Sequence, residues 1–163
     1  MSKTILSMLC AGLVLAGGAA HAETRVAKPA PVYDPALAKS LGADEHGMRS
    51  YVLVILKTGP KKATDKAERA RIFEGHFANM GRLAFEGKLA VAGPLDGKED
   101  RRGIFILATA DIDEARTWVA TDPVIQSGEM VAEYHKFFSS AALMMVNDVH
   151  GKIEKPKSAA PVK

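Results

Sequence analysis

Apolar residues gather in four short runs along the middle of the chain, each bounded by turn-forming residues. The first run, residues 51–56, is rich in β-branched side chains and is followed by a Gly-Pro step. Short apolar runs without polar alternation are typical of strands buried on both faces of a sheet. The other three runs lie at residues 88–92, 103–108 and 130–137, and the last of them alternates between two sets of side chains. The pattern predicts four β-strands.

Two segments between these runs repeat apolar residues at helical spacing. In the first segment Asp65 is a suitable N-cap, with Glu68 three positions later, and the periodicity continues to Gly87. In the second segment Asp111 has the same role, and Pro123 ends the pattern. The sequence therefore predicts two amphipathic helices.

The predicted order is strand, helix, strand, strand, helix, strand. This order indicates the α+β class and a ferredoxin-like βαββαβ fold, with an antiparallel four-stranded sheet that carries both helices on one face. The opposite face needs a cover, and a second copy of the chain would supply it. The apolar segment 141–146 is suited to clasp that contact. We therefore expect a homodimer.

The start of the chain predicts export. Lys3 precedes an apolar run over residues 5–16, and small residues lead to Ala22. These are the parts of a secretory signal peptide. We expect a signal peptide over residues 1–22, cleavage after Ala22, and a periplasmic or secreted mature protein. A membrane anchor needs about 20 apolar residues, so we expect none after cleavage.

The rest of the chain divides into one domain and two extensions. Residues 23–48 contain three prolines and no periodicity, and residues 147–163 are rich in Lys, Pro and Ala. Both compositions are typical of poorly ordered segments. We expect a flexible N-terminal extension, a domain over residues 49–146 and a disordered C-terminal tail.

Charge and residue content argue against several classes of function. The formal net charge is only +3, and basic and acidic residues alternate instead of clustering, which argues against a nucleic-acid partner. The one cysteine, Cys10, lies in the expected signal peptide, so the mature chain would have neither a thiol nor a disulfide. No histidines have metal-ligand spacing, and no glycine-rich phosphate loop follows a strand. We expect no metal and no cofactor.

Four short motifs, taken in order, resemble those of a known family. They are Gly75-His76-Phe77, Gly81-Arg82-Leu83-Ala84-Phe85-Glu86-Gly87-Lys88-Leu89, Ala92-Gly93-Pro94 and Thr121-Asp122-Pro123. No single motif is specific. The ordered set, within residues 49–138, resembles the YciI-like, or YCII-related, domain.

This resemblance implies a dimeric α/β barrel with an active site proposed to contain a paired histidine and aspartate. His76 matches the histidine on the helix, and Asp122 matches the aspartate of the Asp-Pro step. The activity of the family is mostly unsettled, and a few relatives are linked to the turnover of small aromatic compounds, including dehydrochlorination. The resemblance therefore implies a class of chemistry and no particular substrate.

The residues themselves leave two interpretations open for each member of this pair. Helical spacing places His76 half buried on the shoulder of the apolar stripe. There it is either a general acid or base beside a cleft, or a hydrogen-bonded residue at the edge of the core. Asp122 is either the carboxylate that fixes the tautomer of His76, or the N-cap of the turn over residues 124–127.

Five further residues are candidates for substrate binding. Arg82 lies on the flank of the first helix and is either an anion clamp or a solvated, salt-bridged side chain. The Gly93-Pro94 turn either shapes the chain after a strand or lines the mouth of a pocket. Tyr51 and Tyr134 lie on the first and last strands, where they either present phenols to a ligand or pack in the core.

Two functions compete on this sequence. The first is a cofactor-independent enzyme in which His76, oriented by Asp122, moves a proton on a small cyclic or aromatic compound. The second is a non-catalytic periplasmic protein that binds a small molecule or acts in stress. A group that stabilises developing charge near the histidine favours the enzyme, whereas a sealed apolar pocket favours the binding protein.

Overall fold

The structure is a computed structural model that describes residues 30–155 of the chain. The signal peptide predicted over residues 1–22 lies outside the described residues. The chain divides into two units, Met1–Tyr33 and Asp34–Lys163, and every helix and strand described below lies in the second unit. Within residues 30–155, no helix combines the length and the apolar character needed to cross a membrane.

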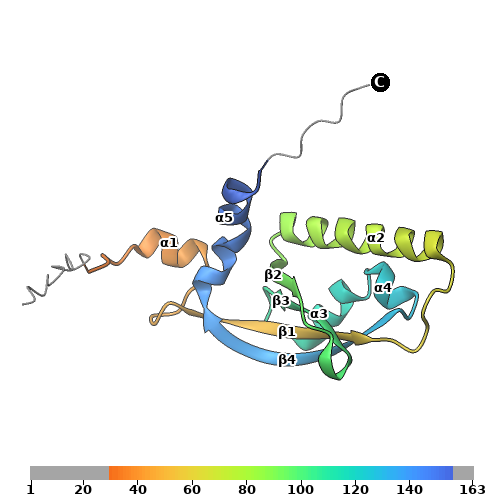
Figure 1. Cartoon of the computed structure of the whole chain (residues 1–163). Helices are drawn as coiled ribbons and strands as arrows, with labels where there is room; N and C mark the ends of the chain where they lie inside the picture. The colour runs from red at the N-terminus through yellow and green to blue at the C-terminus, as the bar shows by residue number, and fades with distance from the viewer. Residues whose placement is uncertain (1–29, 156–163) are drawn as a thin grey trace, which may run out of the picture. The chain divides into compact units, whose positions relative to one another are not determined.

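Four antiparallel strands form one sheet in the order β2-β3-β1-β4 (Figure 1). The strands are β1 (Met48–Thr58), β2 (Leu89–Pro94), β3 (Arg101–Leu107) and β4 (Met130–Ser140). The two central strands, β3 and β1, belong to opposite halves of the βαβ repeat, which is the strand order of a ferredoxin-like fold. The predicted fold class is confirmed.

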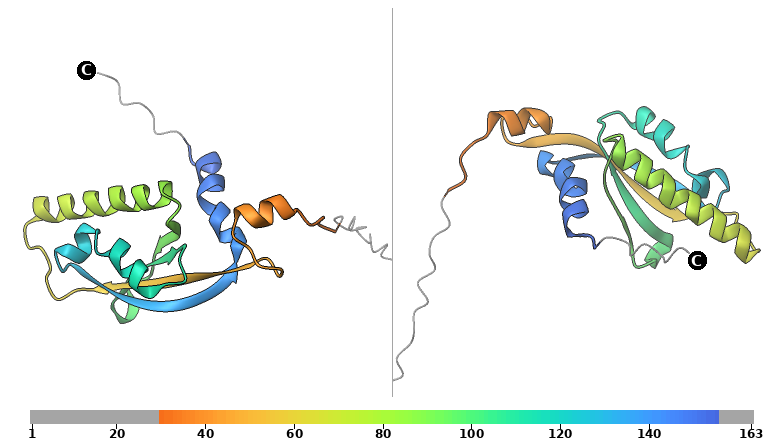
Figure 2. Two further views of the ribbon diagram at one scale, coloured as in Figure 1. Left: turned by 180° about the vertical axis from the view of Figure 1, so that it is seen from behind. Right: turned by 90° about the horizontal axis from the view of Figure 1, so that it is seen from above.

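Three helices pack on one face of the sheet: α2 (Lys66–Phe85), α3 (Ile112–Val119) and α4 (Pro123–Gln126). Asp65 caps α2 and Asp111 caps α3, each through a side-chain oxygen that accepts a backbone N–H of the first turn. The short α4 lies beside α2 (Figures 1 and 2). This contact brings the chain after α3 against the middle of the long helix.

Alternation along β1 builds two apolar clusters, one on each face of the sheet. Val52, Val54 and Leu56 point toward the helices and are buried with Phe105 of β3. Tyr51 points the other way and packs in the second cluster. Successive side chains of a strand face opposite sides, so one strand contributes to both clusters.

The first and last strands of the chain are longer than the apolar runs predicted. Strands β1 and β4 pair along their full length, from Met48 opposite Ser140 to Thr58 opposite Met130. Ladder hydrogen bonds join backbone groups, so polar residues at the ends of a strand pair as well as apolar ones. Side-chain pattern alone therefore places the ends of these strands too far inward.

Each predicted extension contains a helix in its described part. Helix α1 (Pro35–Ser40) begins after Asp34, whose carboxylate accepts two backbone N–H groups, and a proline occupies its first position. Helix α5 (Val146–Ile153) follows a 3-10 turn, η2 (Ala141–Met145). Composition did not indicate these two helices: Asp34 caps α1, and α5 contacts β2. The flexibility of the two extensions stays a prediction. The boundaries of the domain stay predictions.

The segment expected to clasp a second copy packs on its own chain instead. Leu143 and Met144 of η2 contact the cluster around Tyr51, and Asn147 Nδ2 donates to the Leu89 carbonyl at 2.8 Å. The segment covers only part of the second sheet face, since Val131 of β4 remains 43% exposed. The homodimer stays a prediction, without this segment as its clasp.

Candidate functional site

The inner stripe of α2 carries a histidine at its centre. The buried residues of this helix are His76, Asn79 and Leu83, whereas Phe77 is 63% exposed. His76 is only 7% exposed, so the expected half-buried shoulder position is wrong. The helix is rotated toward its polar side because the buried imidazole has a hydrogen-bond partner, which removes most of the cost of burial.

That partner is Asp122, which is fully buried between α3 and α4. His76 Nδ1 lies 2.8 Å from Asp122 Oδ2 and 3.0 Å from Oδ1. The same Oδ1 accepts the backbone N–H of Val124 at 3.1 Å and so caps α4. The two interpretations of Asp122 therefore hold together: it is a helix cap and the carboxylate behind the histidine.

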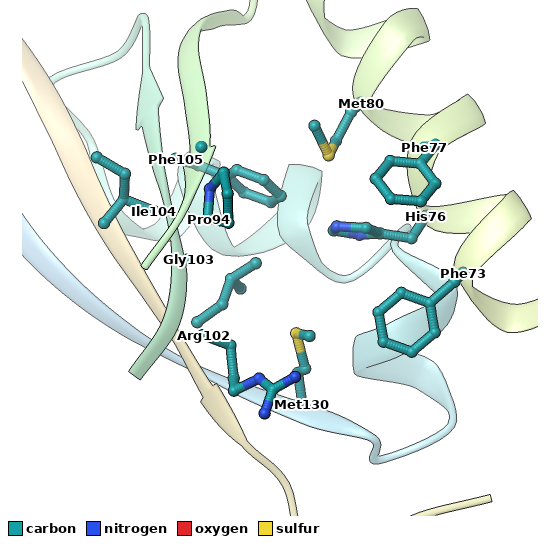
Figure 3. Close-up of a pocket in the computed structure, with 12 residues that line it drawn as sticks. Phe73, His76, Phe77, Met80, Pro94, Arg102, Gly103, Ile104, Phe105 and Met130 are labelled. Carbon is teal, nitrogen blue, oxygen red and sulfur yellow. The ribbon is translucent and has the colours of Figure 1, made fainter. Parts of the chain in front are cut away.

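This contact determines which nitrogen of His76 is available to a ligand. A carboxylate only accepts hydrogen bonds, so Nδ1 carries the proton that it donates to Asp122. Within residues 30–155, Nε2 has no protein hydrogen-bond partner. The ring reaches from α2 into a cavity (Figure 3), where the lone pair of Nε2 can accept a hydrogen bond from a ligand.

The cavity has a volume of about 270 Å³ and lies between α2 and the strands β2 and β3. Most of its wall is apolar, and its apolar lining residues include Leu56, Phe73, Phe77, Met80, Phe105 and Met130. The imidazole of His76 stacks on Phe105, with ring centroids 6.0 Å apart and planes 23° apart, and meets the edge of Phe73. Among the residues that the structure describes, two polar side chains line it, His76 and Arg102 (Figure 3).

The profile of the YCII-related domain matches residues 50–137, more than half of the 163-residue chain. The chain belongs to the YCII-related domain family. Among solved structures, a 5-chloro-2-hydroxyhydroquinone dehydrochlorinase from Burkholderia phenoliruptrix AC1100, in complex with 2,5-dihydroxybenzoquinone, is similar at 21% sequence identity and a TM-score of 0.35. The likeness covers 54% of this chain and 90% of that chain. Among curated proteins, none matches.

The YCII-related domain gathers some of the predicted ligand-binding residues and separates others. Gly93 and Pro94 line the cavity together with His76. Arg82 does not line it, and its guanidinium donates instead to Glu86, Asn79 and Thr121. Arg82 thus ties α2 to the residue before Asp122, and the salt-bridged interpretation of this arginine fits the structure.

The two predicted tyrosines lie on opposite faces of the sheet. Tyr134 pairs with Val54 on the helix side, and Tyr51 lies in the other cluster, where its hydroxyl donates to the Ser140 carbonyl at 3.1 Å. Neither lines the cavity of the YCII-related domain. Burial raises the pKa of both phenols, against the lowering charges of Arg49 and Arg116. Packing is the role that these positions support.

Arg102 is the site residue that sequence reasoning missed. It follows Asp100 and Arg101 in a charged segment whose composition indicates a solvated surface loop. The structure instead begins β3 at Arg101, and this start brings the next side chain to the cavity. A basic residue directly before an apolar strand was the available signal.

Within residues 30–155 of the YCII-related domain protein, no three His, Cys, Asp or Glu side chains are grouped to hold a metal ion.

Proposed function

We propose that this protein is a cofactor-independent enzyme that moves a proton on a small cyclic or aromatic compound. His76 is the proton-transferring residue and Asp122 is the positioning residue behind it. The observation that carries the proposal is the 2.8 Å contact between His76 Nδ1 and Asp122, combined with the open second nitrogen at an apolar cavity. A general base needs this arrangement of a fixed tautomer and a free lone pair.

The reaction begins when Nε2 takes a proton from the bound compound and the buried Asp122 carboxylate stabilises the resulting imidazolium. In an isomerisation the imidazolium returns the proton to another atom of the same compound. In an elimination the electron pair of the broken C–H bond forms a double bond, and the leaving group departs as an anion. Both outcomes balance without an oxidant or reductant.

Arg102 is suited to stabilise the negative charge that develops on the compound. In the described part of the chain it is the one arginine or lysine that lines the cavity, and most of the surrounding wall is apolar. Its side chain is exposed to solvent, so water screens part of the attraction between its charge and an anion in the cavity. The presence of this guanidinium favours the enzyme over a purely apolar binding pocket.

Solvent exchange tests the proposal across a panel of compounds, whichever of them is the substrate. The protein is incubated in D₂O with single-ring hydroquinones, quinones and cyclic enones, and proton NMR follows the loss of individual C–H signals. We expect catalysed exchange at one position of at least one compound. The variant His76→Gln should slow it by about 100-fold or more, the usual contribution of a general base.

His135→Gln is the matched control, because His135 is an exposed histidine on β4 outside the cavity. Exchange at the same rate in His76→Gln and in the unaltered protein would refute the assigned role of His76. The second candidate is a non-catalytic binding protein, which the mostly apolar cavity wall favours. It would be supported by compounds that bind in the cavity while none of them exchanges.

A further inference from the structure

A second, smaller hollow adjoins the cavity. It has a volume of about 40 Å³ and is lined by Thr58, Lys62, Arg69, Arg102, Glu129 and Met130. We call it the side hollow. Arg102 and Met130 line both spaces. Arg69 lines the side hollow only, and its guanidinium carbon lies 5.0 Å from the centre of the Phe73 ring, which is part of the cavity wall.

The side hollow carries three cationic side chains and one carboxylate. Glu129 is buried and both of its oxygens are engaged: Oε1 accepts from Arg69 at 2.6 Å and Oε2 accepts the Ala63 N–H at 2.8 Å. Burial raises the pKa of Glu129, but these two hydrogen bonds and the charges of Arg69 and Lys62 outweigh it and leave the pKa below its ordinary value. The carboxylate is therefore ionised, and its negative charge is paired with the guanidinium of Arg69.

The charges of the other two cations are not neutralised in this way. Within residues 30–155, the side chains of Arg102 and Lys62 make no salt bridge and no hydrogen bond. The neighbouring Arg101, by contrast, pairs with Glu99 at 3.0 Å. Both side chains are exposed to solvent. A cleft lined by an excess of one charge attracts ligands of the opposite charge, so this hollow favours an anion.

We infer that the ligand of this site is a cyclic or aromatic carboxylate, with its ring in the cavity at His76 and its carboxylate in the side hollow between Arg102 and Lys62. This inference rests on the proposed function and names its substrate class. The side hollow has about three times the space that one water molecule needs, enough for a group of three heavy atoms. A guanidinium matches the two oxygens of a carboxylate with two parallel N–H donors.

The two spaces also fix how such a ligand would lie. A single ring suits the cavity, which is near the lower limit of small-molecule pockets. Anchoring the carboxylate at Arg102 would hold the ring against Phe73 and Phe105, within reach of the free nitrogen of His76. Two anchoring points of different chemistry orient a small ligand better than an apolar wall alone.

Calorimetric titration of the full chain with 4-hydroxybenzoate and 4-hydroxybenzamide at pH 7.5 tests this inference. The two probes have nearly the same shape and differ in the charge of one group. We expect the carboxylate to bind at least tenfold more tightly than the amide. In Arg102→Gln the preference for the carboxylate over the amide should fall by tenfold or more, because the charged guanidinium that binds the anion is removed.

Arg101→Gln is the matched control, since it removes one positive charge from the adjacent residue outside both spaces. It should keep the preference for the carboxylate. Equal affinity for the two probes, or no detectable binding of either, overturns the inference, as does an equal loss in both arginine variants. His76→Gln should keep the preference, so a failed proton-transfer role and a failed anion subsite give different results.

Discussion

At the scale of single residues, the shared oxygen of Asp122 joins folding to chemistry. Oδ1 accepts both from His76 and from the Val124 N–H, while Oδ2 accepts from His76 alone. Substitutions can separate the two roles, because an amide keeps an acceptor oxygen for the cap and an alanine keeps nothing. The pair of variants therefore measures what the cap and the charge each contribute.

Asp122→Asn should abolish the fixed tautomer of His76 while α4 stays capped. An asparagine can donate to Nδ1 as well as accept from it, so the proton is no longer confined to that nitrogen. We expect ¹⁵N imidazole spectra to show a mixture of tautomers and the exchange rate to fall by about 100-fold or more. Asp122→Ala should in addition lose about 1–2 kcal/mol of stability with the cap. A single unchanged tautomer in Asp122→Asn would contradict this assignment.

Glu129 gives a pH-dependent contribution to stability. Its pKa is lowered in the folded protein, so the contribution is full above the unfolded value, near the ordinary 4.5, and is lost as pH falls through the folded value. Urea unfolding of the unaltered protein and of Glu129→Gln should differ most near neutral pH and converge below pH 4.5. Glu133→Gln, on exposed β4, is the control and should show a smaller effect at every pH. A constant difference for Glu129→Gln across this range would contradict the linkage.

The family resemblance singles out the histidine and the aspartate in the sequence, but local rules could not decide their roles. A capping aspartate and a histidine-orienting aspartate look the same in a sequence, and here one residue is both. The place of Arg102 at the cavity could not be predicted from the sequence, for a different reason. Its position depends on where β3 begins and on how β3 pairs with β2, which is a tertiary property.

At the scale of elements, the close approach of α2 and α4 depends on a glycine. A methyl group at Gly75 would lie 2.9 Å from Cγ of Pro123, whereas one at Gly81 of the same helix would meet nothing within 4 Å. Alanine is favoured over glycine in a helix by up to about 1 kcal/mol. An alanine would therefore gain the same helix propensity at either position, but only the one at position 75 would clash with Pro123.

Gly81→Ala should raise the free energy of unfolding by roughly 0.5–1 kcal/mol. Gly75→Ala should lose that gain, because Pro123 must move, and the shift should also disturb the contact of its neighbour His76 with Asp122. Thermal unfolding and the ¹⁵N imidazole spectrum together measure both effects. Equal stabilisation by the two alanines, with an unchanged spectrum, would contradict this prediction, because it would mean that Pro123 and α4 move aside without loss of stability.

The order of the elements and the faces of the strands followed from periodicity. The rotation of α2, the ends of the strands and the helices α1 and α5 did not. Strands β1 and β4 extend as far as backbone pairing allows, which side-chain pattern does not report. The segment after β4 looked like a clasp because it is apolar, and apolar character does not say which sheet it will cover. Its contact with β2 arises from the path of the chain after Ser140.

At the scale of the whole molecule, the second face of the sheet is covered only in part by the chain itself. Ile55 is half buried on this face, and Val131 is exposed. Ile55 lies on the central strand β1 and Val131 on the neighbouring edge strand β4, and apolar residues of this kind are suited to an isologous contact with a second copy. We therefore keep the prediction of a homodimer that uses the sheet face.

Size-exclusion chromatography with light scattering should give twice the mass of one chain. Ile55→Glu should shift the protein to the monomer, because a buried unpaired charge at the contact is costly. Phe85→Glu adds the same charge on the last turn of α2, where the side chain is 93% exposed, and should leave the dimer intact. A monomer at micromolar concentration in the unaltered protein would refute the prediction.

The oxygen that Asp122 shares between His76 and Val124 has one more consequence. Any compound that withdraws or adds charge at the imidazole changes the electron density on that carboxylate, and so the hydrogen bond to the Val124 amide. The backbone N–H of Val124 is thus a built-in spectroscopic reporter of the occupied cavity. Compound collections can be screened on the shift of this single amide resonance, before any reaction is known.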